Sequence, residues 1–234
     1  MTLKQLTKKL LELRDRGYVV SRRRGPTGIG HTFEKEMRVR ESNLSIPDLG
    51  GRVELKTSRK DAGSFVTLFT FNKGVWQIPL KRVLADYGYT DENGRLALYN
   101  MVKANSVNSQ GLRLRLDKSA NKVHLIHNGT SLLIAEWSIY TIVGKFMNKT
   151  ERLLLVGAKS RINEMGKEEF HYNKAILFSD PDPDKFMKAF EKGEIVIDVR
   201  MHQRANGSVR NHGTGIRMKE SSIPGLYSKK KILF

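Results

Sequence analysis

The sequence predicts a mixed α/β fold in which a central β-sheet is flanked by helices. Strand-like runs such as RVELKTSR, FVTLFTFN and RLLLVGAKSRI recur between segments with helical spacing, without a strict β-α-β rhythm. The chain has 234 residues, the size of one α/β domain, and contains no internal repeat and no Pro/Ser-rich linker. We therefore expect a single domain over residues 1–234, which could form two lobes around a cleft.

Helices are expected at four places. At the N-terminus, Thr2 and Gln5 have the spacing of a capping box, and Gly17 marks the helix end. The apolar face of this first helix is formed by leucines at helical spacing: Leu3, Leu6, Leu10 and Leu13. The other three are expected at about Thr32 to Arg40, at PLKRVLADYG with its leading proline, and at PDPDKFMKAFEKG.

Two pairs of strand-like runs are expected to form antiparallel hairpins. RLLLVGAKSRI and EEFHYNKAILFS flank the turn sequence NEMGK, and EIVIDVRMHQR and HGTGIRMKE flank the loop ANGSVRN. Shorter strand candidates are LRLRL, KVHLI and SLLIAEW. The later hairpin lies near the C-terminus, within residues 194–220.

The charge of the chain indicates a polyanionic partner. Lys and Arg number 42 against 24 Asp and Glu, which gives a formal net charge of +18. The basic residues are spread along the chain, with local runs at Arg22-Arg23-Arg24 and Lys229-Lys230-Lys231, so the charge belongs to a folded surface.

Several classes of protein are excluded or disfavoured by composition. The chain has no cysteine, which rules out disulfides, thiolate zinc sites and cysteine nucleophiles. The N-terminus is charged every few residues, and no apolar run approaches 18 residues, so we expect neither a signal peptide nor a membrane span. A cytoplasmic location is the expectation.

Glu54 and Lys56 are the strongest candidates for chemistry. Side chains two apart in a strand share a face, so this carboxylate and this ammonium project together while Val53 and Leu55 point to the other side. Gly50 and Gly51 permit a bend that brings Asp48 towards Glu54. Two close carboxylates repel each other unless a cation lies between them, which predicts a partial shell for Mg²⁺ from Asp48 and Glu54.

The stretch GPTGIGHT has a rival interpretation as a phosphate-binding loop. The glycine spacing fits, but His31 stands where that loop requires a lysine, and a neutral imidazole cannot neutralise nucleotide phosphates. The stretch is better explained as a flexible entry to the second helix that lets Arg22, Arg23 and Arg24 approach DNA phosphates.

Pro47-Asp48 followed by Glu54-Leu55-Lys56 resembles the signature of the PD-(D/E)XK nuclease superfamily. Longer stretches, namely RGPTGIGHTFE, SIPDLGGRVELKTSR, and IDVR with HGTGIRM, resemble the MvaI/BcnI type of restriction endonuclease, which is itself similar to the mismatch-repair nicking enzyme MutH. The resemblance covers most of the chain, but residues 75 to 150 offer no motif.

The resemblance implies a restriction-endonuclease-like, MutH-like fold and a type II restriction endonuclease that cuts double-stranded DNA with Mg²⁺. It implies a monomer that cuts one strand at a time at a short G·C-rich site of the CCNGG kind, alongside a companion methyltransferase. By the same resemblance Glu34 joins Asp48, Glu54 and Lys56 as a catalytic residue. Glu36, on the same helix, is expected to be solvated surface. Catalysis would lie in residues 1–75 and 150–180, and DNA recognition in residues 194–220.

The expected recognition hairpin supplies side chains suited to base edges. Arginine can pair with guanine N7 and O6, and aspartate can accept from cytosine N4. Asp198, Arg200, His202 and Arg204 alternate onto one face, while the loop and return strand add Arg210, His212 and Arg217. The resemblance favours Asp198, Arg200, His212 and Arg217 as base readers, with Arg210 a weaker match.

Two alternatives stay open from the sequence. One is a MutH-like nicking endonuclease that a repair partner activates. The other is a non-catalytic DNA-binding protein whose acidic cluster is only a structural ion site, which predicts binding that is insensitive to Mg²⁺.

Overall fold

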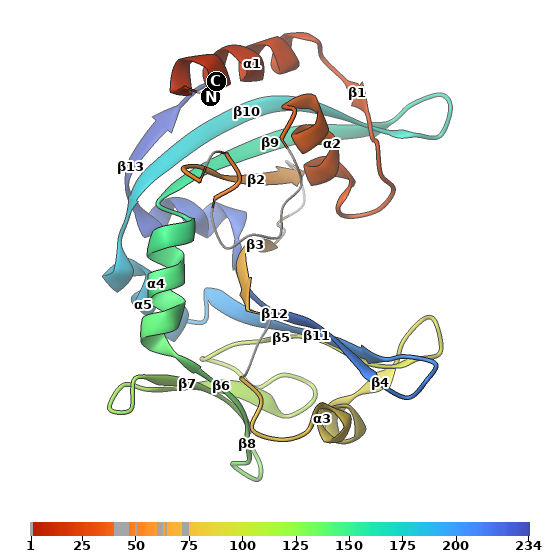
Figure 1. The fold of residues 1–234 in the computed structure, drawn as a ribbon, viewed down its shortest axis with the longest axis vertical. Helices are drawn as coiled ribbons and strands as arrows, with labels where there is room; N and C mark the ends of the chain where they lie inside the picture. The colour runs from red at the N-terminus through yellow and green to blue at the C-terminus, as the bar shows by residue number, and fades with distance from the viewer. Residues whose placement is uncertain (1, 40–46, 50, 60–62, 64, 72–74) are drawn as a thin grey trace. The chain divides into compact units, whose positions relative to one another are not determined.

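The structure is a computed structural model that describes residues 2–39, 47–49, 51–59, 63, 65–71 and 75–234. It has a mixed α/β architecture with three β-sheets, which confirms the predicted fold class (Figure 1). The chain divides into two compact units. The first unit comprises Met1–Val66, Phe146–Asp182 and Lys219–Phe234, and the second comprises Thr67–Lys145 and Pro183–Met218.

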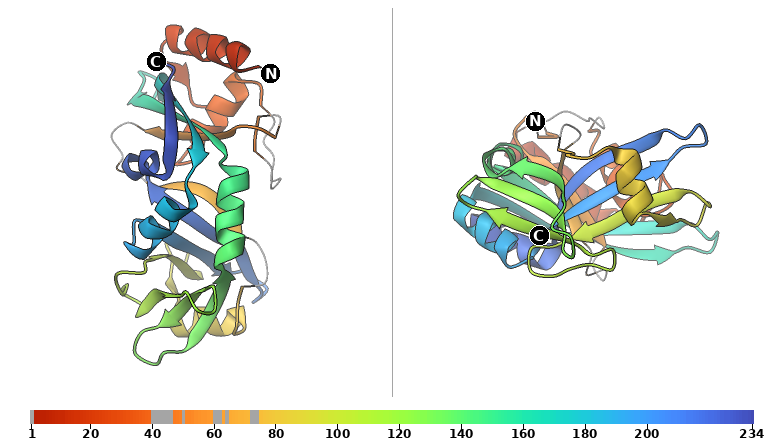
Figure 2. Two further views of the ribbon diagram at one scale, coloured as in Figure 1. Left: turned by 90° about the vertical axis from the view of Figure 1, so that its left-hand side faces the viewer. Right: turned by 90° about the horizontal axis from the view of Figure 1, so that it is seen from below.

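A five-stranded mixed sheet forms the first unit. Its strands are β1 (Val19–Val20), β2 (Glu54–Arg59), β9 (Arg152–Ile162), β10 (Glu168–Pro181) and β13 (Tyr227–Ile232). β9 and β10 pair antiparallel, as the sequence predicts, whereas β2 pairs with β9 in parallel. β13, which was not predicted, runs antiparallel beside β10 (Figure 2).

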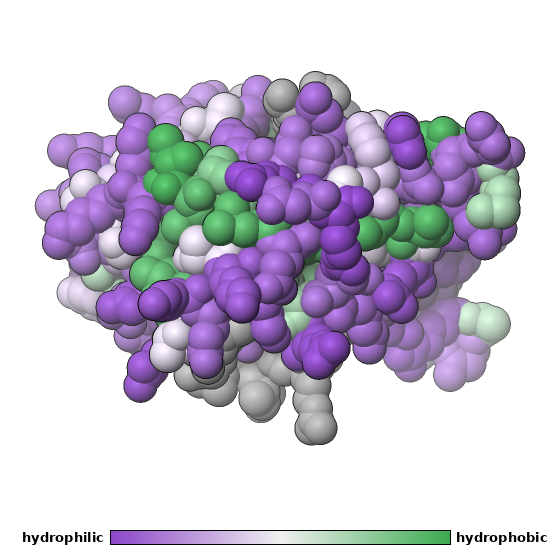
Figure 3. All heavy atoms as spheres, turned by 90° about the horizontal axis from the view of Figure 1, so that it is seen from above, coloured by the Kyte–Doolittle hydropathy of each residue, from purple (hydrophilic) through white to green (hydrophobic). Residues whose placement is uncertain are grey.

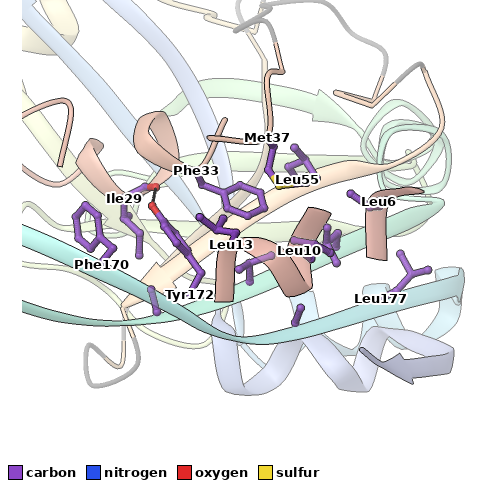
Figure 4. Packing of buried hydrophobic residues seen from close by; sticks show 14 residues of the cluster. Leu6, Leu10, Leu13, Ile29, Phe33, Met37, Leu55, Phe170, Tyr172 and Leu177 are labelled. Atoms are coloured by element: carbon purple, nitrogen blue, oxygen red, sulfur yellow. Dashed lines mark hydrogen bonds between the residues drawn. The ribbon is translucent and has the colours of Figure 1, made fainter. Parts of the chain in front are cut away.

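Helices α1 (Leu3–Asp15) and α2 (Gly28–Glu36) pack on this sheet. α1 begins at the predicted capping box, in which the Thr2 hydroxyl accepts from Gln5 N and the Gln5 side chain accepts from Thr2 N. Three of the predicted leucines are buried, together with Phe33 of α2 and Leu55 of β2 (Figure 4): Leu6, Leu10 and Leu13. Leu3 remains 41% exposed. Apolar side chains do reach the surface beside α1, in separate groups among hydrophilic ones (Figure 3).

The expected second helix was wrong at its start, because α2 begins at Gly28 rather than near Thr32. The helix also ends at Glu36, four residues before the expected end at Arg40. The first turn of the helix includes Gly28 and Gly30. Gly28 packs directly against the chain at Ser21–Arg23, where an added Cβ would clash with the carbonyl oxygen of Arg23. The segment that was expected to be a flexible entry is therefore a close-packed helix start.

Two further sheets and three helices belong mainly to the second unit. One sheet has the order β3-β12-β11-β5-β4 and the other the order β6-β7-β8. The strands of the first are β3 (Phe65–Phe71), β4 (Tyr89–Thr90), β5 (Leu96–Val102), β11 (Ile195–Gln203) and β12 (Val209–Lys219). Those of the second are β6 (Leu112–Asp117), β7 (Lys122–His127) and β8 (Leu133–Ser138). The helices are α3 (Leu80–Tyr87), α4 (Ile139–Lys149) and α5 (Pro183–Glu191). A 3-10 helix, Glu220–Leu226, belongs to the first unit.

β11 and β12 form the antiparallel hairpin that the sequence predicts, with a register shift between Val199 and Met201. β5, β13 and α4 were not predicted.

Among the described residues, no helix has both the length and the apolar character needed to cross a membrane.

Candidate functional site

Glu54 and Lys56 lie on the same face of β2, as the pleat predicts. Lys56 Nζ is 2.6 Å from Glu54 Oε1, while Leu55 between them belongs to the hydrophobic core of the first unit. Glu54 is only 1% exposed, so this carboxylate is far more buried than a strand with one solvated face would leave it. The pair is therefore a buried charge-assisted contact rather than a surface ion pair.

A short turn carries Asp48 back towards the start of β2. Leu49 and Val53 form an isolated antiparallel bridge, and Gly51 has a φ of +70°, a conformation that glycine adopts without strain. Gly50, the other glycine of the expected bend, lies outside the described residues. Asp48 Oδ2 accepts a hydrogen bond from Leu55 N at 3.0 Å, so the backbone of the strand positions this carboxylate.

Burial is the main cause that raises the pKa of Glu54 above its usual value. The charge of Asp48 raises this pKa further, whereas the ammonium groups of Lys56 and Lys149 lower it. Lys149, at the end of α4, places its Nζ 3.7 Å from Glu54 Oε1. Two lysines thus face one buried carboxylate, and the second was not predicted from the sequence.

The free atoms of this group fit a divalent cation. Glu54 Oε2 is buried and has no hydrogen-bond partner, which leaves one carboxylate oxygen available as a ligand. Asp48 supplies a second carboxylate that raises the pKa of Glu54 by its charge. In the described part of the chain, no group of three or more His, Cys, Asp or Glu side chains is arranged to hold a metal ion.

Glu34 lies in α2, and its side chain is half-buried. The helix packs against β2, because Phe33 and Leu55 share one hydrophobic cluster (Figure 4). The helix that bears Glu34 is thus a direct neighbour of the strand that bears Glu54. Its catalytic role stays a prediction.

Glu36 was expected to be solvated surface, and this expectation was wrong. Its side chain is only 10% exposed, and its two oxygens accept from Arg16 at 2.7 Å and Arg22 at 2.8 Å. Burial raises the pKa of Glu36, but the two arginines more than offset this, so the pKa lies below its usual value. Glu36 fixes Arg22, one of the residues predicted to contact DNA, while Arg23 and Arg24 are exposed.

On the β11–β12 hairpin, Asp198, Arg200 and Arg217 form one group. Arg217 Nη1 donates to Asp198 Oδ2 at 2.9 Å, and Arg200 Nε lies 3.7 Å from the same oxygen. Gly215 pairs directly with Asp198, and an added Cβ there would meet all three side chains at 3.6–3.7 Å. One nearly buried carboxylate thus lies beside two guanidinium groups.

His202 and His212 form a second group on this hairpin. His212 Nε2 is 3.1 Å from His202 Nδ1, and the hydroxyl of Tyr99 on β5 is 2.9 Å from the same nitrogen. Burial lowers the pKa of both histidines, and Arg210 lowers both further. Both imidazoles are therefore held in their neutral form more strongly than a free histidine.

The remaining predicted hairpin residues are exposed arginines. Arg210 lies on β12 opposite His202, and Arg204 begins the turn that joins the two strands. The predicted hairpin residues thus fall into an ordered carboxylate–arginine group, a histidine group and these two solvent-facing cations.

Two residues that contact the candidate site residues were not predicted from the sequence. Lys149 reaches Glu54 from α4, and Tyr99 reaches His202 from β5; both lie in the stretch without a motif. Neither carries a local sequence signal, because each contact depends on the packing of elements far apart in the chain.

Comparison with known proteins relates the chain to a family of restriction endonucleases. The sequence pattern of the MvaI/BcnI restriction endonuclease family matches residues 7–227. A solved complex of restriction endonuclease MvaI with its cognate DNA substrate is similar over 100% of both chains, with a TM-score of 0.83 and 26% identity. Restriction endonuclease MvaI without DNA is similar over 100% of this chain and 99% of that chain, with a TM-score of 0.53 and 24% identity. No curated protein matches.

Proposed function

The chain belongs to the MvaI/BcnI restriction endonuclease family, and from this we propose that it cuts DNA with Mg²⁺ at a short G·C-rich site of the CCNGG kind, one strand at a time. It is a type II site-specific deoxyribonuclease that acts on double-stranded DNA. The observation that carries the proposal is the buried Glu54 carboxylate, which has one oxygen on Lys56 and the other without a partner.

Asp48 and Glu54 are the proposed ligands of Mg²⁺. The bound ion supplies charge stabilisation for the phosphate and the leaving 3′ oxygen. Glu54 Oε2 is the better-defined ligand atom because it is buried and unpartnered, while the Asp48 carboxylate is held by Leu55 N. Glu34 is proposed to complete the acidic cluster from α2.

Lys56 is the proposed group that orients the attacking water. Its ammonium can donate a hydrogen bond to a water oxygen. Because Lys56 Nζ lies beside Glu54, a water bound to it would lie close to the Glu54 carboxylate. Lys149 Nζ lies 3.7 Å from Glu54 Oε1, so a second ammonium would stay near this oxygen if Lys56 turned towards water. Lys149 is therefore proposed to keep the carboxylate charged and oriented through the reaction.

The hairpin is the proposed reader of base edges. Arg200 and Arg217 suit guanine N7 and O6, and Asp198 both orients them and suits cytosine N4. His202 and His212 are neutral readers beside them, while Arg204, Arg210 and Arg22 to Arg24 suit phosphates. In this proposal catalysis is a property of the first unit and base reading of the second.

A plasmid digest tests the proposal. Unmethylated plasmid is incubated with the purified protein in Mg²⁺ or in EDTA, and the fragment ends are sequenced. We expect discrete, metal-dependent fragments with 5′-phosphate ends, preceded by a nicked intermediate. Random cutting, or cutting that is equal in EDTA, would contradict it.

The remaining parts of the proposal concern the setting of the enzyme. A monomer in solution, a companion DNA methyltransferase that protects the host site, and a cytoplasmic location fit a restriction system of this family. Sedimentation at micromolar concentration checks the first of these, with one species near the 26.7 kDa chain mass as the expected result.

A further inference from the structure

The turn between β9 and β10 presents two large apolar side chains to solvent. Ile162 is 66% exposed and Met165 is 73% exposed, among the highest values of the large apolar residues that the structure describes. The hairpin extends past β1 and α2 (Figure 1). Two apolar side chains three positions apart at the end of a projecting element form a small apolar surface that can contact a partner.

The hairpin end is braced, so this exposure is not that of a loose loop. Asn163 N donates to Lys167 O at 2.9 Å, and Gly166, with a φ of +69°, closes the turn on Asn163 O. The Asn163 side chain accepts from Met165 N and donates to Glu169. The apolar tip is therefore held in its exposed position before any partner arrives.

Arg59 ties the start of β10, next to the tip of the hairpin, to the loop that follows the basic run. Its guanidinium makes two hydrogen bonds to Glu168, at 2.8 and 3.0 Å, and also donates to the carbonyl oxygens of Gly25 and Pro26. Only Ser21 separates β1 from the exposed residues Arg22 to Arg24, and β1 pairs with the next residues of β10, Glu169 and Phe170. The basic run, Arg22 to Arg24, is thus held next to the tip of the hairpin by these contacts.

The charges of the hairpin suit a polyanion. Glu168 and Glu169 are paired with Arg59 and Arg161, so these carboxylates carry little free negative charge. Lys159 and Lys167 are exposed on either side of the tip. Glu164 is the one opposing charge in the turn itself.

The tip of the hairpin is far from Glu54, which lies on β2, the strand that pairs with β9. Glu54 of β2 is in register with Leu153 of β9, and Ile162 follows nine positions later along β9. At a rise of about 3.3 Å per residue, the separation is about 30 Å, or about nine base-pair steps of B-form DNA. A tip that touches the bound duplex at this distance lies beyond a recognition site of the CCNGG kind.

We propose that the β9–β10 hairpin is a flank-binding arm, in which Ile162 and Met165 enter the minor groove of DNA outside the recognition site. Apolar side chains such as Ile and Met act in this way in other minor-groove binders. Lys159, Lys167 and the basic run bind the adjoining phosphates. This inference rests on the proposed function, because it needs a duplex bound at the catalytic site.

The test compares two duplexes that contain the cut site, one with about 4 and one with about 15 flanking base pairs on each side. Binding is measured by fluorescence anisotropy with excess site-free duplex, in a Lys56→Ala background that cannot cut. The parent is expected to bind the long duplex about tenfold tighter than the short one. The double variant Ile162→Ser/Met165→Ser is expected to lose this difference and to bind the short duplex as the parent does.

Ile232→Ser is the matched control, since Ile232 is also 66% exposed but lies on β13. It should keep the full preference for the long duplex. Glu164→Gln, which removes the opposing charge, should increase that preference.

Three results would contradict the proposal that the hairpin binds flanking DNA. The double variant could keep the full flank dependence, or Ile232→Ser could lose it equally, or the double variant could dissociate a dimer, which would make the tip a contact between copies of the chain. Failure of the parent to bind either duplex specifically would instead overturn the proposed function, and the arm with it.

Discussion

Asp48 Oδ2 accepts a hydrogen bond from the backbone N of Leu55, the residue between Glu54 and Lys56. The strand that carries one carboxylate therefore positions the other through its main chain. The relationship predicts different results for two substitutions at Asp48. Asp48→Asn keeps an oxygen that can accept from Leu55 N but loses the charge, so cutting should fall by several orders of magnitude at nearly unchanged stability.

Asp48→Ala removes both the charge and the acceptor, and should lower the free energy of unfolding by about 0.5–1.5 kcal/mol in addition. Urea denaturation and a single-turnover cutting assay measure the two effects. If Asp48→Asn cut at the wild-type rate, Asp48 would be a purely structural acceptor.

Lys149 provides a pH-dependent test of the catalytic group. The pKa of Glu54 is raised above 4.5, mainly by burial, so loss of cutting on acidification should have its midpoint above pH 4.5 when Mg²⁺ is below saturation and competes with protons. Lys149 lowers this pKa, so Lys149→Met should move the midpoint to higher pH, and Lys149→Arg should restore it. An unchanged midpoint in Lys149→Met would show that the 3.7 Å contact has no electrostatic effect on Glu54.

Arg217 tests base reading on the hairpin. Arg217→Ala should weaken binding to the cognate site by about 1–3 kcal/mol, the value of one bidentate base contact, with little change on unrelated DNA. Asp198→Asn should show part of the same loss because it releases the guanidinium that Asp198 holds at 2.9 Å. Equal weakening on cognate and unrelated duplexes would make Arg217 a phosphate contact instead.

The histidine pair predicts low titration midpoints. Burial and nearby arginines lower the pKa of His202 and His212, so both should titrate below pH 6.5 in an NMR pH series and be neutral at pH 7. Tyr99→Phe removes the hydroxyl that lies 2.9 Å from His202 Nδ1 and should perturb the His202 resonances. A midpoint above 6.5 for both residues would show that the pair is solvated.

Features that depend on neighbours along the chain could be read from the sequence. The pairing of Glu54 with Lys56 follows from the two-residue period of a strand, and the start of α1 follows from the capping box at Thr2. The β9–β10 hairpin follows from a polar turn between two apolar runs. Each of these signals lies within one continuous stretch of the chain.

Features that depend on packing could not be read in this way. Lys149 and Glu54 are nearly a hundred residues apart in the chain, and no local pattern links α4 to β2. The burial of Glu36 arises from Arg16 and Arg22 on separate elements, so its helix position alone suggested solvent. The early start of α2 depends on the close approach of Gly28 to Arg23, which helix propensities do not encode.

The most direct test of the central claim separates cutting from binding in Lys56→Ala. The ammonium lies 2.6 Å from Glu54 on a face where it can reach water, so its loss should remove the chemistry and leave the hairpin contacts intact. A defined duplex containing the cut site is used for single-turnover cutting in Mg²⁺ and for anisotropy in parallel. We predict a cutting rate at least about a thousandfold lower, with a Kd within about threefold of wild type. A variant that cuts normally, or one whose lost cutting is matched by an equal loss of binding, would contradict the account.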